Sequence, residues 1–80
     1  MNISEKIKAA FKQLGKHIQM LREERNISIK ELSERTGIRK EYLKKIENGI
    51  AYGVILDKHL LKIAKELKVR LSELFDSERN

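Results

Sequence analysis

Apolar residues recur every three or four positions along nearly the whole chain, and no proline interrupts them. Side chains at this spacing lie on one face of an α-helix, whereas a proline inside a helix would break it. The pattern therefore predicts an all-α fold, in which successive amphipathic helices share one core. The clearest run comprises Ile3, Ile7, Phe11, Leu14, Ile18 and Leu21.

Five helices are predicted from this spacing and from the residues that begin and end helices. Ser28 and Glu31 form the pattern of a capping box, and Asp57 is suited to cap a later helix. Gly37 stands where a left-handed residue would end a helix, and Gly49 ends the helix after it. The expected helices run approximately from Ile3 to Arg25, Ser28 to Thr36, Arg39 to Asn48, Asp57 to Leu67 and Leu71 to Phe75.

The first helix is expected to begin near Ile3, because Asn2 and Glu5 also have the spacing of a capping box. Gly15 lies inside this helix and weakens it by about 1 kcal/mol relative to alanine. A close approach of another backbone would explain a glycine at this position.

The composition excludes several classes of function. Eighty residues form one small domain with little room for an enclosed active site, and the absence of cysteine excludes disulfides and thiolate metal sites. His17 and His59 lack neighbouring ligands at metal spacing, and no serine lies in a nucleophile elbow. We therefore expect no enzymatic activity, no cofactor, no metal and no small-molecule ligand. The chain also lacks a membrane span and a signal-peptide pattern, so we expect a cytoplasmic protein.

The net charge of +6 favours a polyanionic partner. Most of the excess lies in the first half of the chain, where residues 1–40 carry ten lysines and arginines against five acidic residues. A basic N-terminal half of this kind could follow the phosphates of a nucleic acid.

Residues 28–49 predict a short helix, a glycine turn and a second short helix. Two helices joined in this way cross steeply, and the second stands out from the surface. Such a helix, about 10–12 Å wide with its side chains, fits the major groove of DNA. Leu43 and Ile46 must face inward, which leaves an outward face of Arg39, Lys40, Glu41, Lys44 and Lys45.

A spaced signature runs through most of the chain and comprises Leu14-Gly15, Ile18, Leu21-Arg22, Ser28, Glu31-Leu32, Gly37-Ile38, Tyr42-Leu43, Ile46-Glu47-Asn48-Gly49 and Ile63-Ala64-Lys65-Glu66-Leu67. With this signature, residues 14–75 resemble the helix-turn-helix domain of the lambda-repressor/Cro type. The resemblance implies a compact five-helix domain that acts as a small transcriptional regulator by sequence-specific binding to double-stranded DNA. It also implies a structural ion pair between Arg22 and Glu47. We accordingly expect residues 1–13 to extend the first helix, 14–76 to form the helix-turn-helix domain and 77–80 to fray.

The resemblance implies two groups of DNA contacts. Side chains on the outward face of the third helix would reach base edges, where lysine can donate to guanine and glutamate can accept from cytosine. Side chains at the helix ends would bind phosphate and supply most of the affinity. The first group is Lys40, Glu41 and Lys45, with Lys44 on the same face, and the second is Ser28, Lys30, Arg39, Tyr42 and Asn48.

Three features depart from this family pattern. Ile29 stands where the family often has glutamine, Arg39 cannot cap a helix as serine or threonine would, and the loop 50–56 carries no charge. Residues 34–47 are also similar to the cytoplasmic helix-turn-helix domain of bacterial cell-shape proteins, which bind an actin-like filament. A protein-interaction domain of this filament-adaptor type is therefore the alternative function, because one scaffold can host both uses.

The individual contacts of the third helix also have two interpretations. Its lysines either meet DNA or form a solvated face, and Glu41 either accepts from cytosine or complements the helix dipole. Tyr42 either packs its ring against the second helix or meets a phosphate.

The apolar surfaces outside the helix-turn-helix also have two interpretations each. Ile3, Ile7 and Phe11 either cover the domain's own core or pair with a helix of another subunit. The loop 50–56 is either half buried or a partner patch. We expect a homodimer, formed through this loop or through residues 69–75, because two half-sites about one DNA turn apart require a two-fold pair.

Overall fold

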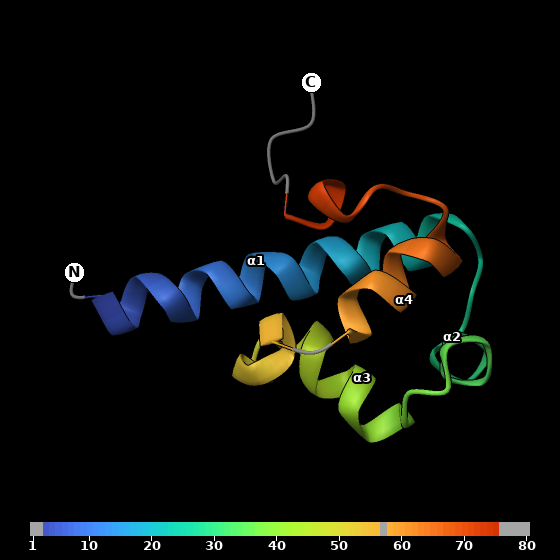
Figure 1. Ribbon diagram of the computed structural model, residues 1–80, viewed down its shortest axis with the longest axis horizontal. Helices are drawn as coiled ribbons and strands as arrows, with labels where there is room; N and C mark the ends of the chain where they lie inside the picture. Colours follow the sequence, from blue (N-terminus) through green and yellow to red (C-terminus); the bar gives the residue numbers. More distant parts are fainter. Residues whose placement is uncertain (1–2, 57, 76–80) are drawn as a thin grey trace.

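The computed structural model describes residues 3–56 and 58–75 of the chain (Figure 1). In this part the long helix α1 crosses the whole molecule, and α3 and α4 lie below it in Figure 1 while η2 returns above it. None of the described helices is both long enough and apolar enough to cross a membrane. The elements are α1 (Ile3–Glu24), α2 (Ile29–Thr36), α3 (Lys40–Glu47), the 3-10 helix η1 (Tyr52–Leu56), α4 (His59–Leu67) and the 3-10 helix η2 (Leu71–Leu74).

Helix α1 ends at Glu24, one residue before its predicted end, because the chain turns at Asn26. Asn26 has a φ of +55°, in the left-handed region that asparagine adopts more readily than most residues. The carbonyl oxygen of Arg22 accepts a hydrogen bond from the amide of Ile27 at 3.1 Å and closes the helix end. At the opposite end of α1, Asn2 of the predicted capping box lies outside the described residues.

The N-terminal part of α1 extends beyond the rest of the molecule (Figure 1). The side chains of residues 4–10 are all exposed, and Ile7 has 47% of its surface in solvent. Burial begins at Phe11, whose ring packs edge-to-face on Tyr52 with a centroid distance of 5.2 Å. Core packing, one of the two predicted uses of these residues, therefore applies to Phe11 and not to Ile7, while the side chain of Ile3 lies outside the described part.

Helices α2 and α3 form the predicted helix-turn-helix. The hydroxyl of Ser28 accepts a hydrogen bond from the amide of Glu31 at 3.0 Å and caps α2 as the sequence predicts. Gly37 ends α2 with a φ of +76°, a conformation that is inexpensive for glycine. In the turn, the Thr36 hydroxyl accepts from the amide of Ile38 at 3.2 Å, and the Ile38 side chain is buried. The turn is therefore held by both polar and apolar contacts.

Helix α4 begins at His59, and Lys58 occupies its N-cap position without a capping side chain. Asp57, which the sequence predicts as the cap, lies outside the described residues, as do residues 77–80, which we expect to fray. Leu61 faces outward with 54% exposure. The inner face of α4 is buried in the common core and comprises Leu60, Ile63, Ala64 and Leu67.

The prediction of a fifth α-helix over Leu71–Phe75 is wrong. Residues Leu71–Leu74 form the 3-10 helix η2, in which the amides of Glu73 and Phe75 donate to carbonyl oxygens three residues earlier. Hydrogen bonds of this separation are typical of 3-10 helices, which mostly occur in pieces of three or four residues. Leu74 is fully buried, so this short segment still closes the core.

The uncharged segment after Gly49 is half buried. Ala51 and Val54 belong to the core, whereas Ile50 and Tyr52 are 53% and 47% exposed. The prediction of a half-buried loop is confirmed for these side chains.

Helices α1 and α3 meet backbone to backbone at Gly15. A Cβ atom at this position would lie 2.4 Å from the carbonyl oxygens of both Ile46 and Glu47, far inside any normal contact distance. The close approach expected from the glycine is therefore confirmed, and it seats the C-terminal end of α3 directly on α1.

We predict that Gly15→Ala destabilises the domain by about 1–3 kcal/mol, even though alanine is the better helix former. The added methyl group must push α3 away from α1. Urea unfolding followed by circular dichroism measures the effect. Gly53→Ala is the matched control, because a Cβ there meets nothing within 4 Å, and it should change stability by less than about 0.5 kcal/mol. Equal stability of the two variants would contradict this account of the contact.

Candidate nucleic-acid interface

Helix α3 has one buried and one exposed face. Leu43 and Ile46 are buried at 0% and 2% exposure, as the sequence predicts. The opposite face consists of exposed charged side chains, three of them lysines, and it comprises Lys40, Glu41, Lys44 and Lys45. The buried leucine and isoleucine fix the rotation of α3, and the charges point to solvent as a consequence.

The N-terminal end of α3 is also cationic. Arg39 holds the N-cap position in an extended conformation, with φ −61° and ψ 144°, and its side chain makes no capping hydrogen bond. The first amides of a helix and its dipole both favour an anion at this end. Arg39 is exposed, so its guanidinium adds a positive charge beside those amides.

The remaining predicted contact positions lie at the ends of the two helices. Ser28 and Lys30 are exposed at the start of α2, and Asn48 is exposed at the end of α3. Ile29 is half-buried against the core, so the residue that departs from the family pattern has a packing role.

Tyr42 packs on a helix other than the one considered from the sequence. Its half-buried ring lies edge-to-face on the imidazole of His59 in α4, with a centroid distance of 5.1 Å and an interplanar angle of 66°. The ring of Tyr42 therefore has a packing role, with His59 of α4 as its observed aromatic partner.

Arg22 and Glu47 form the predicted ion pair. The arginine Nε and Nη2 donate to the two carboxylate oxygens at 2.8 and 3.0 Å, while Nη1 donates to the carbonyl oxygen of Ile27 at 2.7 Å. The two side chains are only 11% and 8% exposed. The hydrogen bond to Glu47 raises the pKa of the Arg22 guanidinium. The pair thus ties α1, the turn before α2 and the end of α3 together.

Two further cations lie next to α3. The prediction of contacts from the helix-turn-helix pattern did not include them. Lys12 and Lys16 are exposed on α1, and a Cβ on Gly49 would lie 2.7 Å from the Cα atom of Lys12. Their spacing of four residues was the available signal, because it places them on one face of a helix. Only the tertiary contact shows that this face adjoins α3.

The described residues contain no group of three or more histidine, aspartate or glutamate side chains arranged to hold a metal ion. A shallow groove lies between the N-terminal part of α1 and the start of η1, and is lined by Glu5, Lys8, Ala9, Lys12, Gly49, Ile50 and Tyr52. The charged surface around α3 is therefore the strongest candidate interface of the described part of the chain.

Comparison with known proteins gives two similarities. A helix-turn-helix family model matches residues 18–74. HTH-type transcriptional regulator SlrR of Bacillus subtilis (strain 168) is 37% identical to this chain over 65 residues. That match covers 81% of this chain, and the chain spans 42% of the length of this curated relative. No solved structure matches the chain significantly.

We predict that Arg22→Ala lowers the free energy of unfolding by about 3 kcal/mol, because it leaves the Glu47 carboxylate largely buried without its partner. Thermal unfolding followed by circular dichroism measures this. Arg35→Ala removes the ion pair with Glu31, whose side chains are both 42% exposed, and should cost less than about 0.5 kcal/mol. An unchanged melting temperature for Arg22→Ala would show that the buried pair does not stabilise the domain.

Proposed function

Because this chain belongs to the XRE/Cro-type helix-turn-helix family, we propose that it binds double-stranded DNA sequence-specifically and acts as a small transcriptional regulator. The name of the related SlrR, a transcriptional regulator, agrees with this function. Since the chain spans 42% of that relative, the proposal concerns the helix-turn-helix domain.

The observation that carries the proposal is the exposed cationic face of α3. A helix with its side chains is about 10–12 Å wide, and the major groove of B-DNA is about 12 Å wide. Leu43 and Ile46 keep the opposite face in the core, so α3 can enter a groove without unfolding any part of the domain. The ion pair of Arg22 and Glu47 supports the helix from behind.

We assign the predicted contacts according to their positions on the two helices. The exposed side chains of α3 would read base edges, with lysine donating to guanine and Glu41 accepting from cytosine. The exposed groups at the helix ends would bind phosphate and set the register on the duplex. The base-reading set is Lys40, Glu41 and Lys45, with Lys44 on the same face. The phosphate-binding set is the exposed Ser28, Lys30, Arg39 and Asn48, together with the half-buried Tyr42.

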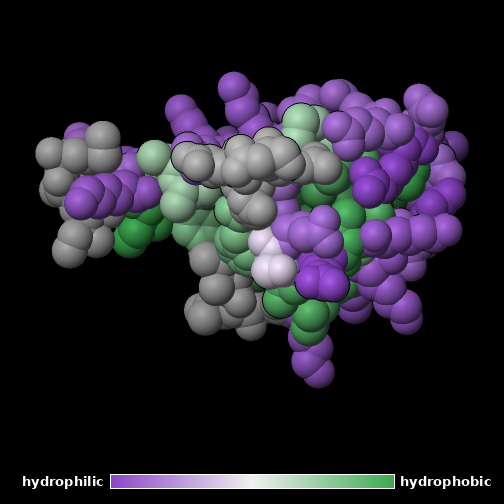
Figure 2. Space-filling model, turned by 90° about the horizontal axis from the view of Figure 1, so that it is seen from above, coloured by the Kyte–Doolittle hydropathy of each residue, from purple (hydrophilic) through white to green (hydrophobic). Residues whose placement is uncertain are grey.

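A homodimer would place two copies of α3 in successive major grooves about 34 Å apart. Exposed apolar side chains support this arrangement at the η2 end, where Leu71 and Phe75 are 38% and 49% exposed. Figure 2 views the molecule from the side opposite α3, and hydrophobic side chains gather in the middle of this face. An interface there would leave α3 available to DNA.

The direct test is binding to duplex DNA across a salt series, measured by fluorescence anisotropy of a labelled duplex. We expect log K to fall linearly with log salt, with a slope of about −0.9 for each phosphate contacted. A slope near zero would overturn the proposal. Such a result would favour the filament-adaptor alternative, which needs no DNA.

Variants of the two proposed contact sets should behave differently. Lys40→Ala should cost about 1–3 kcal/mol on the preferred duplex and relax the preference at one base pair. Lys30→Ala should weaken all sequences alike and reduce the salt slope by about 1. Both effects are measured by competition between duplexes that differ at single base pairs.

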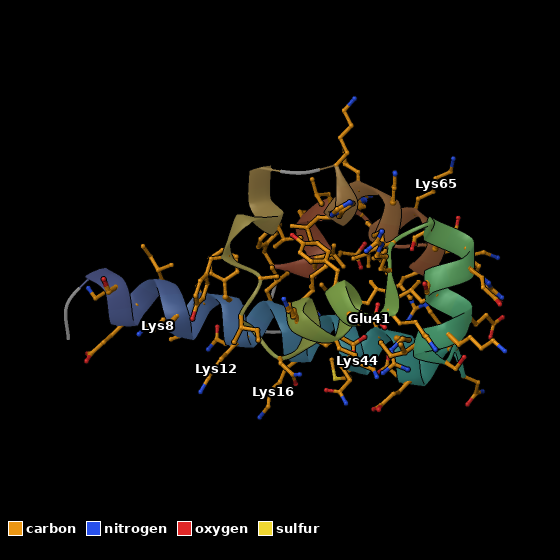
Figure 3. All side chains as sticks on the ribbon, turned by 90° about the horizontal axis from the view of Figure 1, so that it is seen from below. Lys8, Lys12, Lys16, Glu41, Lys44 and Lys65 are labelled. Atoms are coloured by element: carbon orange, nitrogen blue, oxygen red, sulfur yellow. The ribbon has the colours of Figure 1, made fainter. Side chains whose placement is uncertain are left out.

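Lys65→Ala is the control for both variants. Figure 3 shows Lys65 on α4, well away from Lys44 and Glu41 on α3. We therefore expect Lys65→Ala to change the affinity for DNA little. Identical sequence profiles for Lys40→Ala and Lys30→Ala would contradict the assignment of Lys40 to base reading.

A further inference from the structure

Three lysines of α1 follow one another at intervals of four residues. Lys8, Lys12 and Lys16 are all exposed. In the view of Figure 3 they succeed one another along α1, and Lys44 and Glu41 of α3 continue the series. We call Lys8, Lys12 and Lys16 the α1 lysine row. Exposed lysines at this spacing often form only a solvated helix face. The position of the row relative to α3 is therefore what indicates a binding surface.

The α1 lysine row adjoins the C-terminal end of α3. The backbone of Gly49 approaches Lys12 so closely that a Cβ on the glycine would lie 2.7 Å from the Cα atom of Lys12. Gly15, directly before Lys16, meets the carbonyl oxygens of Ile46 and Glu47 in the same way. Two of the three lysines therefore project beside the end of α3, and backbone contacts fix their distance from it.

The α1 lysine row is cationic, although the acidic Glu5 lines the same groove as Lys8 and Lys12. None of the ion pairs found among the described residues involves Lys8, Lys12 or Lys16. The neighbouring Ile50 and Tyr52 are uncharged and line this groove together with Lys8 and Lys12. On this flank of α3, the described part of α1 therefore supplies positive charge.

We propose that the α1 lysine row binds phosphates of the DNA strand that borders the groove occupied by α3. This inference rests on the proposed function and adds a second phosphate-binding surface to it. Lys12 and Lys16 make the principal contacts because they lie beside the end of α3. Lys8 extends the row along the projecting part of α1.

The dimensions of the row agree with this use. Eight residue steps of α-helix lead from Lys8 to Lys16, which corresponds to about 12 Å along the helix axis. One DNA strand presents a phosphate about every 3.4 Å along the duplex axis, so this length matches about three to four phosphates. Lysine is a mobile point charge on a flexible stem, and it can therefore reach phosphates without a matched geometry.

The double variant Lys12→Ala with Lys16→Ala tests the proposal in the same salt series. We expect the slope of log K against log salt to become shallower by about 1.8, because two counterion-releasing contacts are lost. Adding Lys8→Ala should remove up to about 0.9 more. The preference between duplexes should not change, since phosphate contacts carry no direct sequence information. Circular dichroism checks that the variants stay folded, which is expected because alanine favours helix.

The control is the double variant Lys62→Ala with Lys65→Ala on α4. Both side chains are exposed, and Figure 3 shows Lys65 away from the row. This control also removes two positive charges from the net +6. The slope of log K against log salt should stay close to that of the unmodified chain. Equal slopes for the two double variants would overturn the role of the α1 lysine row while DNA binding stands. Absence of salt-dependent binding by the unmodified chain would overturn the proposed function itself, and the inference with it.

Discussion

The backbone contact between α1 and α3 is the interaction on which the rest of the structure depends. At Gly15 no side chain separates the two helices, so the last carbonyl groups of α3 rest directly on α1. Arg22, two helical turns further along α1, holds the same end of α3 through the Glu47 carboxylate. A steric contact and a buried ion pair therefore fix the C-terminal end of α3, while Leu43 and Tyr42 pack its N-terminal half and leave the charged face in solvent.

Within α3, the residues that stabilise the fold are therefore different from those on the charged outer face. The residues that hold the helix are apolar or paired, and they lie on its inner face and at its C-terminal end. The charged residues of its outer face have no part in the core, so they can change without loss of the fold. The same separation holds for α1, whose inner face supports α3 while its exposed lysines add positive charge to the flank of that helix.

Much of the fold could be predicted because its signals are local. The hydroxyl of Ser28 caps the helix that follows it, and Gly37 ends that helix, as the sequence indicates. The pair of Arg22 and Glu47, in contrast, was expected only from the family resemblance, since 25 residues separate its partners. The fifth α-helix was predicted wrongly because an apolar repeat of this length does not distinguish an α-helix from a 3-10 helix.

The sequence by itself determined the helical class, the helix-turn-helix and the outward face of α3, because periodicity and capping act over a few residues. Only the tertiary structure decided which surfaces of the helices pack against one another. Tyr42 packs on His59 of α4, and Lys12 lies against Gly49, because helices distant along the chain meet in space. Such contacts depend on the joint packing of all the helices around one core, and no local pattern encodes them.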